Sequence, residues 1–482
     1  MSTRRIDTYR MELRKTGAMK TDALVYLHER MTAEDEALSQ LRDAASIDPG
    51  AIVVGTPDIH VGYGVPIGSV IGTDEFISPA AVGYDINCGM RLMLTPMGAD
   101  DFPVERVADA IRRDLPLGEG KSNPALSLGG SALERVLSQG VSGLLSVARS
   151  TADLARILDP ERMEADLVKI EDGGCLEADP SVMSQKAKNR GASQLGTLGG
   201  GNHFVEIQRV DRVEDRRAGR ALGINEGQVV VMIHTGSRGL GHQVASEHMR
   251  AAVDCAARRG LTMPNKQLAY VPADSVEGRD YLNAMGCAAN FAFSNRQVIA
   301  ALVRNAVARV LQRSLGMPTL YDVSHNIVKL ERHGGRRLYV HRKGATRAYP
   351  ASMMRNTAFD KLGQPVLIPG SMGTASYVLL GTESASESLY SVNHGAGRVM
   401  SRTAAAGKVR RRDGKILKPG MISDKRFEQT MKDVYLLCED PHTIKEEAPD
   451  AYKDVDLVVD TVVGAGLAKV VARMVPLAVL KG

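Results

Sequence analysis

The alternation of apolar and polar positions divides the chain into strand-rich and helical stretches. Short apolar, β-branched runs at 52–54, 67–71 and 91–94 are separated by glycine and proline, which predicts strands joined by elaborate loops. Apolar residues recur at helical spacing over 103–114 and 131–158. Strand character returns over 196–235, where the run Val229–Ile233 leads directly into His234.

The second half of the chain repeats this division. Alanine-rich helical patterns at 242–258 and about 276–315 predict a helical insertion over 240–316. Residues 317–400 favour strand and loop, and a last helix is expected near 460–474, before an apolar tail over 476–482 that should pack on the body. Residues 1–50 are expected to be a helical lead-in with loops.

Because no regular βαβ alternation emerges, the pattern predicts an α+β fold. The length of 482 residues suits one large elaborated domain or two to three lobes.

Composition narrows the class of protein. Hydrophobic residues are 44% and charged residues 24%, which is ordinary for a soluble globular protein. No apolar run reaches the roughly 18 residues that span a bilayer, and no apolar signal core follows the first charges, so we expect a cytoplasmic protein with no membrane partner. Five cysteines without a CxxC pair argue against a disulfide framework and a structural zinc site.

Net charge leaves the question of a nucleic-acid partner open. The balance of 61 basic and 56 acidic residues gives only +5, although a local cleft can still be basic. Aromatic residues are 4% of the chain and tryptophan is absent, so base stacking on an aromatic platform is not the expected mode. If nucleic acid binds, arginine and lysine on phosphates should dominate.

The residues that can bind a metal stand in short polar or glycine-rich frames instead of periodic elements. Cysteine, histidine and aspartate bind divalent transition metals, and a thiolate can bridge two of them. Each residue alone also has a structural interpretation as a turn aspartate, a buried thiol or a hydrogen-bonded histidine. Together they predict a metal centre built from distant segments: Asp85, Cys88, His203, His234 and His325.

A fourth framed histidine, His394, suits phosphoryl chemistry. It is followed by Gly395–Gly397, whose small side chains leave room for a phosphoryl group, and Arg398 could hold phosphate oxygens. The imidazole is therefore a candidate nucleophile, although a glycine-rich turn with an incidental histidine would read the same way.

Further segments carry groups that bind phosphate. Gly199–Asn202 and Pro369–Ser376 offer bare backbone N–H groups and hydroxyls. The stretch His341–Arg347 puts three cations in seven residues, which could contact phosphates or simply be a solvated loop. The basic stretch Lys408–Arg412 is expected to be an exposed loop. Residues 118–122 resemble only half of a P-loop, because Leu115 stands where GxxxxGK[ST] requires its first glycine.

In this order, these frames resemble the RtcB family of RNA-splicing and RNA-repair ligases. The resemblance covers nearly the whole chain, and the concatenation is specific although each piece is weak. Residues 1–50 and the loop 117–123 match less well. The matching frames are Pro57–Gly64, Gly83–Arg91, Gly199–Glu206, His234–Gly239, His325–Asn326, His341–Arg347, Gly370–Tyr377, His394–Arg402, Glu447–Pro449, Tyr452–Asp454 and Leu480–Gly482.

The resemblance implies that residues 1–482 form a single large α+β catalytic globule with a strand-rich core and a helical insertion. It also implies a GTP-dependent ligase that uses two Mn²⁺ ions. Such enzymes join RNA ending in a 2′,3′-cyclic phosphate or 3′-phosphate to RNA with a 5′-hydroxyl, through a guanylylated histidine and an RNA-(3′)pp(5′)G intermediate. His394 matches that histidine. The implied partners are RNA with these ends, such as tRNA halves, and an accessory activator resembling archease is compatible with the resemblance.

The resemblance also implies the ligand sets. Cys88 is expected to bridge the two metals, with His234 and His325 on one and Asp85 and His203 on the other. Glu206 and Lys481 are expected at the base or ribose. The full nucleotide site carries over as Asn202, His203, Phe204, Val205, Glu206, His325, Asn326, Pro369, Gly370, Ser371, Met372, Ser376, His394, Gly395, Ala396, Gly397 and Lys481.

Two other functions remain open at this point. A metal-dependent phosphatase or cyclic phosphodiesterase acting on RNA ends would need the metal ligands but neither His394 nor Lys481. A non-catalytic RNA-end binder would show no dependence on GTP or Mn²⁺, and the intact ligand set argues against it.

Overall fold

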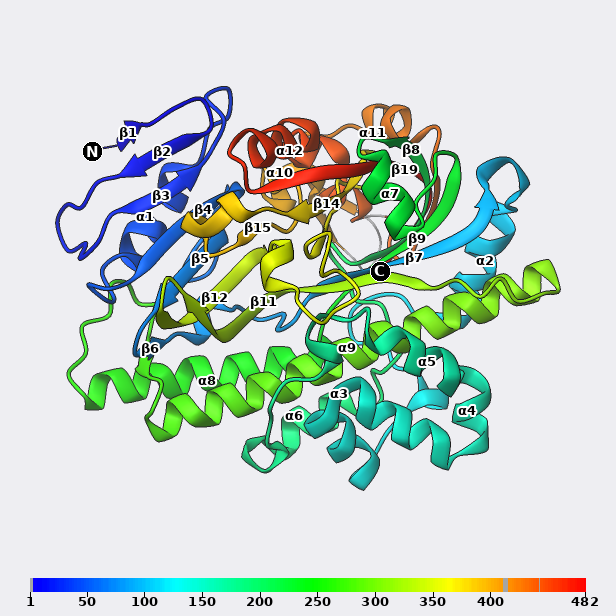
Figure 1. The fold of residues 1–482 in the computed structure, drawn as a ribbon, viewed down its shortest axis with the longest axis horizontal. Coiled ribbons are helices and arrows are strands. Elements are labelled where there is room, and N and C mark those ends of the chain that lie inside the picture. Colours follow the sequence, from blue (N-terminus) through cyan, green and yellow to red (C-terminus); the bar gives the residue numbers. More distant parts are fainter. Residues whose placement is uncertain (1–2, 411–414, 442) are drawn as a thin grey trace.

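A computed structural model describes residues 3–410, 415–441 and 443–482 of this chain. In these residues a 15-stranded sheet runs through the molecule, and helices cover it on both sides (Figure 1). The α+β prediction is confirmed. None of the helices in the described ranges is both long enough and apolar enough to cross a membrane.

The order of strands in the large sheet differs strongly from their order in the chain. Neighbouring strands are antiparallel except for the parallel pairs β3–β4 and β18–β19. The path is β1 (Thr3–Arg5), β2 (Arg10–Leu13), β3 (Ala23–Tyr26), β4 (Ile52–His60), β5 (Ile67–Thr73), β12 (Arg336–Arg347), β11 (Thr319–His333), β7 (Gly89–Gly98), β9 (Gln228–Thr235), β8 (Phe204–Val213), β19 (Ala468–Lys481), β14 (Ser376–Gly381) and β13 (Pro365–Ile368), with β15 (Ser391–Asn393) on β12 and β18 (Tyr435–Cys438) on β19.

Two further pairs of strands lie outside this sheet. They are β6 (Phe76–Ile77) with β10 (Val271–Pro272), and β16 (Gly407–Arg410) with β17 (Lys415–Pro419). The helices are α1 (Asp35–Ala44), α2 (Val104–Asp114), α3 (Gly130–Ser150), α4 (Ala152–Leu158), α5 (Pro160–Leu167), α6 (Gln185–Gly191), α7 (Arg216–Leu222), α8 (Arg238–Arg258), α9 (Val276–Leu311), α10 (Arg402–Ala406), α11 (Asp424–Met431) and α12 (Val455–Gly464).

The 36-residue helix α9 is the main support of the sheet. Its first turn is capped by Ser275, whose hydroxyl accepts a hydrogen bond from the Gly278 N–H at 3.0 Å. Its middle is buried on nearly every side, and Ile299 and Val303 share an apolar cluster with Val231 of β9. Helices α8 and α9 thus occupy the expected 240–316 segment, but α9 is part of the central core and α3 to α6 extend the same helical region (Figure 1).

Two expectations about local structure are wrong. Residues 1–50 are not a helical lead-in, because strands β1 to β3 add to the sheet beside β4 and only α1 is an α-helix there. The last helix, α12, ends at Gly464, since Gly466 adopts a left-handed φ of 72°, and the expected helix 460–474 gives way to strand β19 from Ala468 onward. The helical prediction over 131–158 is confirmed by α3 and α4, with breaks at Gly140 (φ 56°, ψ −134°) and between the two helices.

The basic stretch Lys408–Arg412 lies partly in β16 instead of a loop, with Lys408 and Arg410 exposed. Residues 411 and 412 lie outside the described residues.

Candidate active site

The framed residues meet at one end of the central strands. Cys88 immediately precedes β7, His203 precedes β8, His234 lies at the end of β9, and His325 lies on β11 beside an irregularity in the β11–β12 register. Because β11, β7, β9 and β8 are consecutive antiparallel neighbours, these positions lie close together on the same side of the central strands. Local apolar strands therefore bring ligands from 240 residues of sequence to one place.

The five predicted metal ligands form two groups that share Cys88. In one group, the Nε2 atom of His234 lies 3.2 Å from the Cys88 Sγ and 3.2 Å from the His325 Nε2. In the other, the His203 Nε2 lies 2.7 Å from the Asp85 Oδ2 and 3.3 Å from the same Sγ. A thiolate, three imidazoles and a carboxylate are donors that suit a borderline transition metal, and the Cys88 sulfur belongs to both groups.

Burial sets the protonation of this cluster. Burial lowers the pKa values of His234 and His325 well below the ordinary range for histidine, so both imidazoles are neutral and can offer a lone pair. Burial disfavours the charged form of Asp85, but the adjacent His203 outweighs it and lowers the pKa of that carboxyl to about 2. Burial and the neighbouring Asp85 carboxylate raise the pKa of the Cys88 thiol, against the opposing effect of Arg296.

A fully buried arginine fastens the backbone around this cluster. Arg296 of α9 donates from Nη1 to the carbonyl of Asn87, before Cys88, at 2.8 Å, and to the carbonyl of Thr235, after His234, at 3.0 Å. Its Nε donates to Asp322 of β11, the strand that carries His325, at 3.0 Å.

Asp322 in turn accepts a hydrogen bond from the Nε of Arg91 at 2.8 Å. The side chains of Arg91, Arg296 and Asp322 are all 0% exposed. One carboxylate between two guanidiniums therefore holds β7, β9 and β11 in the relative positions that the metal cluster needs.

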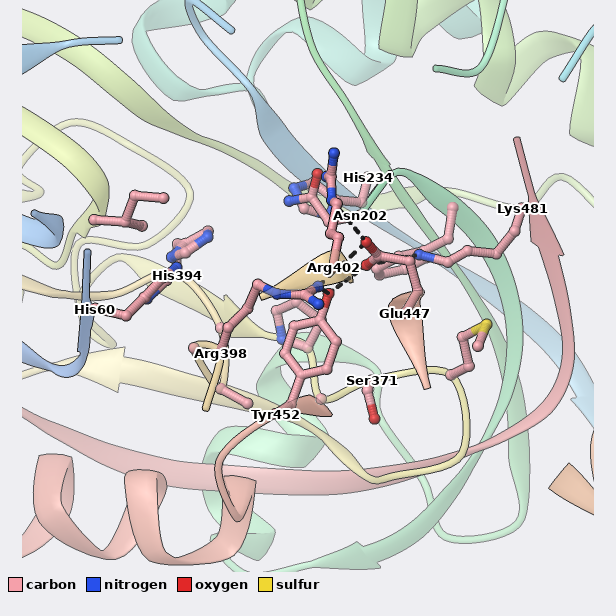
Figure 2. Close-up of a pocket in the computed structure, with 18 residues that line it drawn as sticks. His60, Asn202, His234, Ser371, His394, Arg398, Arg402, Glu447, Tyr452 and Lys481 are labelled. Carbon is pink, nitrogen blue, oxygen red and sulfur yellow. Dashed lines mark hydrogen bonds and ion pairs between the residues drawn. The ribbon is translucent and has the colours of Figure 1, made fainter. Parts of the chain in front are cut away.

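A cavity of about 190 Å³ adjoins the cluster and contains His394 (Figure 2). The imidazole rings of His394 and His325 have centroids 4.8 Å apart. The lining comes from β15–α10, the β13–β14 loop, the end of β19 and the approach to β8. It consists of His60, Ile67, Asn202, Phe204, His234, Pro369, Gly370, Ser371, Met372, His394, Gly395, Ala396, Gly397, Arg398, Arg402, Glu447, Tyr452 and Lys481.

A buried carboxylate fixes His394. The His394 Nδ1 donates to the Oδ2 of Asp58 at 2.8 Å, and the Thr56 hydroxyl donates to the Oδ1 of the same carboxylate at 2.6 Å. Asp58 is 0% exposed and Nδ1 carries the proton of this bond, so Nε2 is left with its lone pair. Gly397 approaches closely too, since a Cβ there would lie 2.3 Å from the Asp58 carbonyl oxygen and its φ is 77°. The geometry is that of an oriented imidazole nucleophile.

Charged residues close the far side of the cavity. Glu447 is buried and contacts Arg398 and Arg402, each at 3.3 Å, and Lys481 at 3.7 Å (Figure 2). The guanidinium of Arg398 is otherwise occupied by carbonyl and tyrosine oxygens, while about half of the Arg402 side chain is exposed. Arg402 is therefore better placed than Arg398 to receive a phosphate.

Comparison with known proteins gives this arrangement a family. The family model described as "tRNA-splicing ligase RtcB" matches residues 40–482. The protein of that name from Thermococcus kodakarensis is 43% identical over 99% of this chain and 98% of its own length. Those from Archaeoglobus fulgidus (99% of this chain, 98% of its own length) and Aeropyrum pernix (100% of both) are each 41% identical. The chain belongs to the RtcB family.

The structure brings most of the RtcB-derived nucleotide residues to the cavity. Asn202, Phe204, the Pro369–Met372 segment, His394–Gly397 and Lys481 all line it. Glu206 does not line the cavity: it is buried on β8, on the same face as Phe204, and accepts a hydrogen bond from the Gln208 Nε2 at 2.6 Å. The Gln208 amide also donates to the Ser376 hydroxyl at 3.0 Å. Glu206 and Ser376 therefore share Gln208 as a partner and lie behind the residues that line the cavity.

The remaining predicted residues lie in the metal-ligand cluster, beside it or under the sheet. Asn326 adopts a left-handed φ of 61° and bridges two segments: its Nδ2 donates to the Asp85 carbonyl at 3.1 Å, and its Oδ1 accepts from the Gly344 N–H at 2.7 Å. His203 and His325 belong to the metal cluster, and Val205 points into the apolar cluster under the sheet.

Several residues of this RtcB-family site received no role from the sequence alone. Asp58 and His60 stand in a strand, and Glu447 and Tyr452 lie about fifty residues beyond His394, so no local spacing connects them with it. Their signal was present only in the matching frames that begin at Pro57, Glu447 and Tyr452. Arg402 closes the frame that begins at His394.

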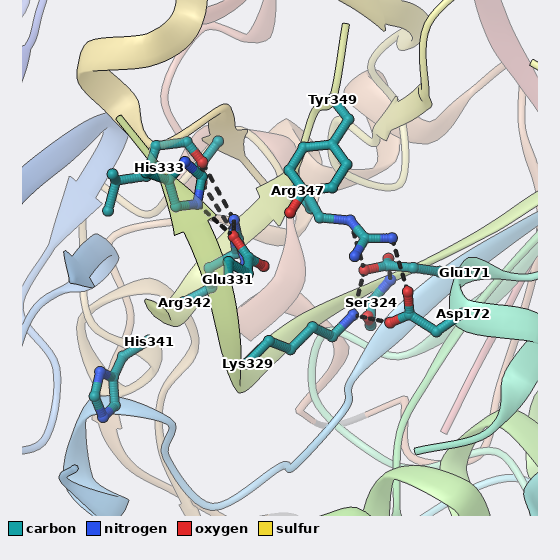
Figure 3. Close-up of polar contacts among 12 residues, drawn as sticks. Glu171, Asp172, Ser324, Lys329, Glu331, His333, His341, Arg342, Arg347 and Tyr349 are labelled. Carbon is teal, nitrogen blue, oxygen red and sulfur yellow. Dashed lines mark hydrogen bonds and ion pairs between the residues drawn. The ribbon is translucent and has the colours of Figure 1, made fainter. Parts of the chain in front are cut away.

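The cations of the basic stretch His341–Arg347 have partners within the protein, which disfavours both a solvated loop and a phosphate-binding role. Arg342 is paired with Glu331, and Arg347 with Glu171 and Asp172 (Figure 3). Lys343 donates to the carbonyls of Tyr63, Val65 and Ala80. These cations face inward because β12 is a central strand, and they support the β11–β12 pair that carries His325.

Replacing Asp322 should destabilise the protein far more than replacing a less buried carboxylate that also pairs with an arginine of α9. Asp322→Ala leaves two buried guanidiniums uncompensated, so we expect the free energy of unfolding to fall by about 3–5 kcal/mol. The matched control is Asp114→Ala, which removes the 26%-exposed partner of Arg309, a half-exposed arginine also on α9, and should cost no more than about 1 kcal/mol. Equal losses in denaturant titrations would contradict the supporting role of Asp322.

Stability should depend on pH through Glu206. Burial raises the pKa of this carboxyl to about 8 from 4.5, against the opposing effects of Gln208 and Lys481. Between these values Glu206 is neutral when folded and ionised when unfolded, so the free energy of unfolding falls as pH rises, by up to about 1.4 kcal/mol per pH unit.

Glu206→Gln should abolish this contribution. The variant should gain stability relative to the parent protein between about pH 5 and pH 8, measured by denaturant titration without nucleotide. Glu214→Gln, an exposed glutamate just after the same strand, is the control and should leave the pH dependence unchanged. A constant difference between parent and Glu206→Gln across this range would refute the assignment.

Proposed function

We propose that this protein is a GTP-dependent RNA ligase that joins 2′,3′-cyclic phosphate or 3′-phosphate ends to 5′-hydroxyl ends. The observation that carries the proposal is the Asp58–His394 pair inside a cavity that adjoins a metal-binding cluster. The names of the relatives, tRNA-splicing ligases, support the substrate class.

His394 is proposed as the nucleophile. Its Nε2 attacks the α-phosphorus of GTP, a nitrogen–phosphorus bond forms, and the bond to the departing pyrophosphate breaks. Asp58 holds the Nδ1 proton and stabilises the positive charge that develops on the ring.

RNA then passes through three further steps. Water opens a cyclic phosphate to a 3′-phosphate, whose oxygen attacks the phosphorus carried by His394 and releases the imidazole, giving RNA-(3′)pp(5′)G. The 5′-hydroxyl oxygen of the second RNA attacks the 3′-phosphorus, GMP leaves, and the hydroxyl proton is lost to solvent or a nearby base. The products are a 3′,5′-phosphodiester and GMP.

The cluster of Asp85, Cys88, His203, His234 and His325 would hold two metal ions, proposed as Mn²⁺. Bound there, they would neutralise charge on the phosphoryl oxygens next to His394. The mixed oxygen, nitrogen and sulfur donors and the shared Cys88 sulfur fit this role, and the neutral His234 and His325 imidazoles need lose no proton to bind.

The cavity residues divide the proposed nucleotide site into two parts. Asn202 and the Pro369–Met372 segment lie next to His394 and would contact the phosphates and ribose, together with Arg402. Lys481 donates to the Gly201 carbonyl at 2.9 Å and lies 3.7 Å from Glu447; in this proposal it contacts the guanine or the ribose. Glu206, behind the wall, would act on the base only by displacing Gln208.

The setting of the reaction follows from the same proposal. The RNA partners would be tRNA halves or other cleaved RNAs with these ends, in the cytoplasm, with an archease-like activator as an accessory.

Labelled GTP tests the nucleophile directly. Protein incubated with GTP labelled at the α-phosphate and Mn²⁺ should give a labelled band on a denaturing gel. His394→Ala should give none, and Asp58→Asn should slow labelling by about 10²-fold or more, because an amide can turn the imidazole to the wrong tautomer. His248→Ala, a half-buried histidine on α8 away from the cavity, should label like the parent protein.

The alternative function predicts a different pattern in the same experiment. A metal-dependent cyclic phosphodiesterase would open the 2′,3′-cyclic phosphate without GTP, would not be labelled, and would keep its activity in His394→Ala. That result would replace the ligase mechanism.

A further inference from the structure

Three aromatic rings from distant segments form a strip outside the nucleotide cavity. The rings of Tyr84 and His242 are stacked, with centroids 4.9 Å apart and planes 22° apart. Tyr63 meets Tyr84 edge to face at 5.5 Å. We call Tyr63, Tyr84 and His242 the aromatic strip.

The strip lies at the open side of the metal cluster. Tyr84 directly precedes the metal ligand Asp85, whose side chain is 32% exposed, whereas the side chain of its partner His203 is 7% exposed. None of the three rings lines the cavity of His394, which reaches the cluster from the His325 side. A chain that approaches the cluster without passing through the nucleotide cavity therefore meets the strip.

Cations flank this approach. Arg190 is exposed and donates to the Gln243 Oε1 at 3.0 Å. Burial lowers the pKa of the His242 imidazole, and the nearby charge of Arg190 lowers it further. Arg238 opens α8, one turn before His242, and its side chain reaches over to the carbonyl of Gly118 at 3.1 Å. Cations beside aromatic faces are the combination that binds single-stranded nucleic acid.

The exposure of the rings separates this arrangement from ordinary core packing. Tyr63 is 37% exposed and His242 is exposed. If these rings only packed α8 against the loop before β5, the surrounding loops could have covered them. Such rings keep a free face on which another planar group can stack.

We propose that the aromatic strip stacks an unpaired RNA base next to the end being joined. The inference rests on the proposed ligase function and adds a binding surface to it. It also revises the expectation that stacking plays little part: the chain has few aromatic residues, but three of its rings are gathered where the RNA end must pass.

The test combines variants of the strip with RNA that lacks a base. Tyr63→Ala and His242→Ala should raise the KM for RNA in the joining reaction by about 5- to 150-fold, the equivalent of about 1–3 kcal/mol of stacking. Tyr63→Phe keeps the ring and should join RNA like the parent protein. Labelling of His394 by GTP should be unchanged in all three variants, because the strip lies outside the nucleotide cavity.

An abasic nucleotide supplies the second half of the test. It is placed at the terminus of the 3′-phosphate strand in one series and of the 5′-hydroxyl strand in the other. At the end that stacks, the abasic change should weaken the parent protein about as much as Tyr63→Ala does, and should add little to Tyr63→Ala. This lack of additivity is expected of direct contact and not of a general disturbance of the fold.

The outcomes are distinguishable. If the parent protein labels and joins RNA, but the variant and abasic effects add fully at both ends, the strip does not stack bases and the ligase proposal stands. If the parent protein neither labels nor joins, the ligase proposal fails and the strip proposal falls with it.

Discussion

The site depends on one buried cluster of charge, Asp322 between Arg91 and Arg296. Burying ions is costly unless they are paired and hydrogen-bonded, and here the carboxylate meets both guanidiniums while Arg296 also binds two carbonyls. Because those carbonyls adjoin Cys88 and His234, helix α9 holds the start of β7 and the end of β9 in position. The same arginine favours ionisation of the Cys88 thiol, opposing burial and Asp85, so the support also eases metal binding.

Around this support, the chemistry is divided between two halves that meet at His325 and His394. On one side are donors that suit metal ions, and on the other is a cavity that contains His394, the proposed nucleophile, held by Asp58. Asn326, next to His325 on β11, holds the loop of Asp85, and Lys481 at the end of β19 completes the cavity. The proposed phosphoryl transfers use both halves at once, which explains why they are packed ring against ring.

The sequence was informative where a signal is local. Framed histidines, the strand before His234 and the long alanine-rich helix could all be located, because each depends on a few adjacent residues. Structure that depends on distant partners could not: β1 to β3 form because β4 offers an edge, and β19 replaces an expected helix because β8 and β14 lie on either side of it. Asp58 and the inward-facing cations of β12 are hidden for the same reason, since only the fold shows what they face.

The placement of β19 has a consequence for biogenesis. This strand follows the other described strands of the sheet in the chain, yet it lies inside the sheet, antiparallel to β8 and β14 and parallel to β18, and it brings Lys481 beside Phe204. During synthesis, one edge of β8 therefore stays unpaired while more than half of the chain's length is added. Strand β14 also lacks its partner until β19 is made. Unpaired strand edges can pair with other chains, so we expect the nascent protein to benefit from a chaperone until β19 pairs with β8 and β14.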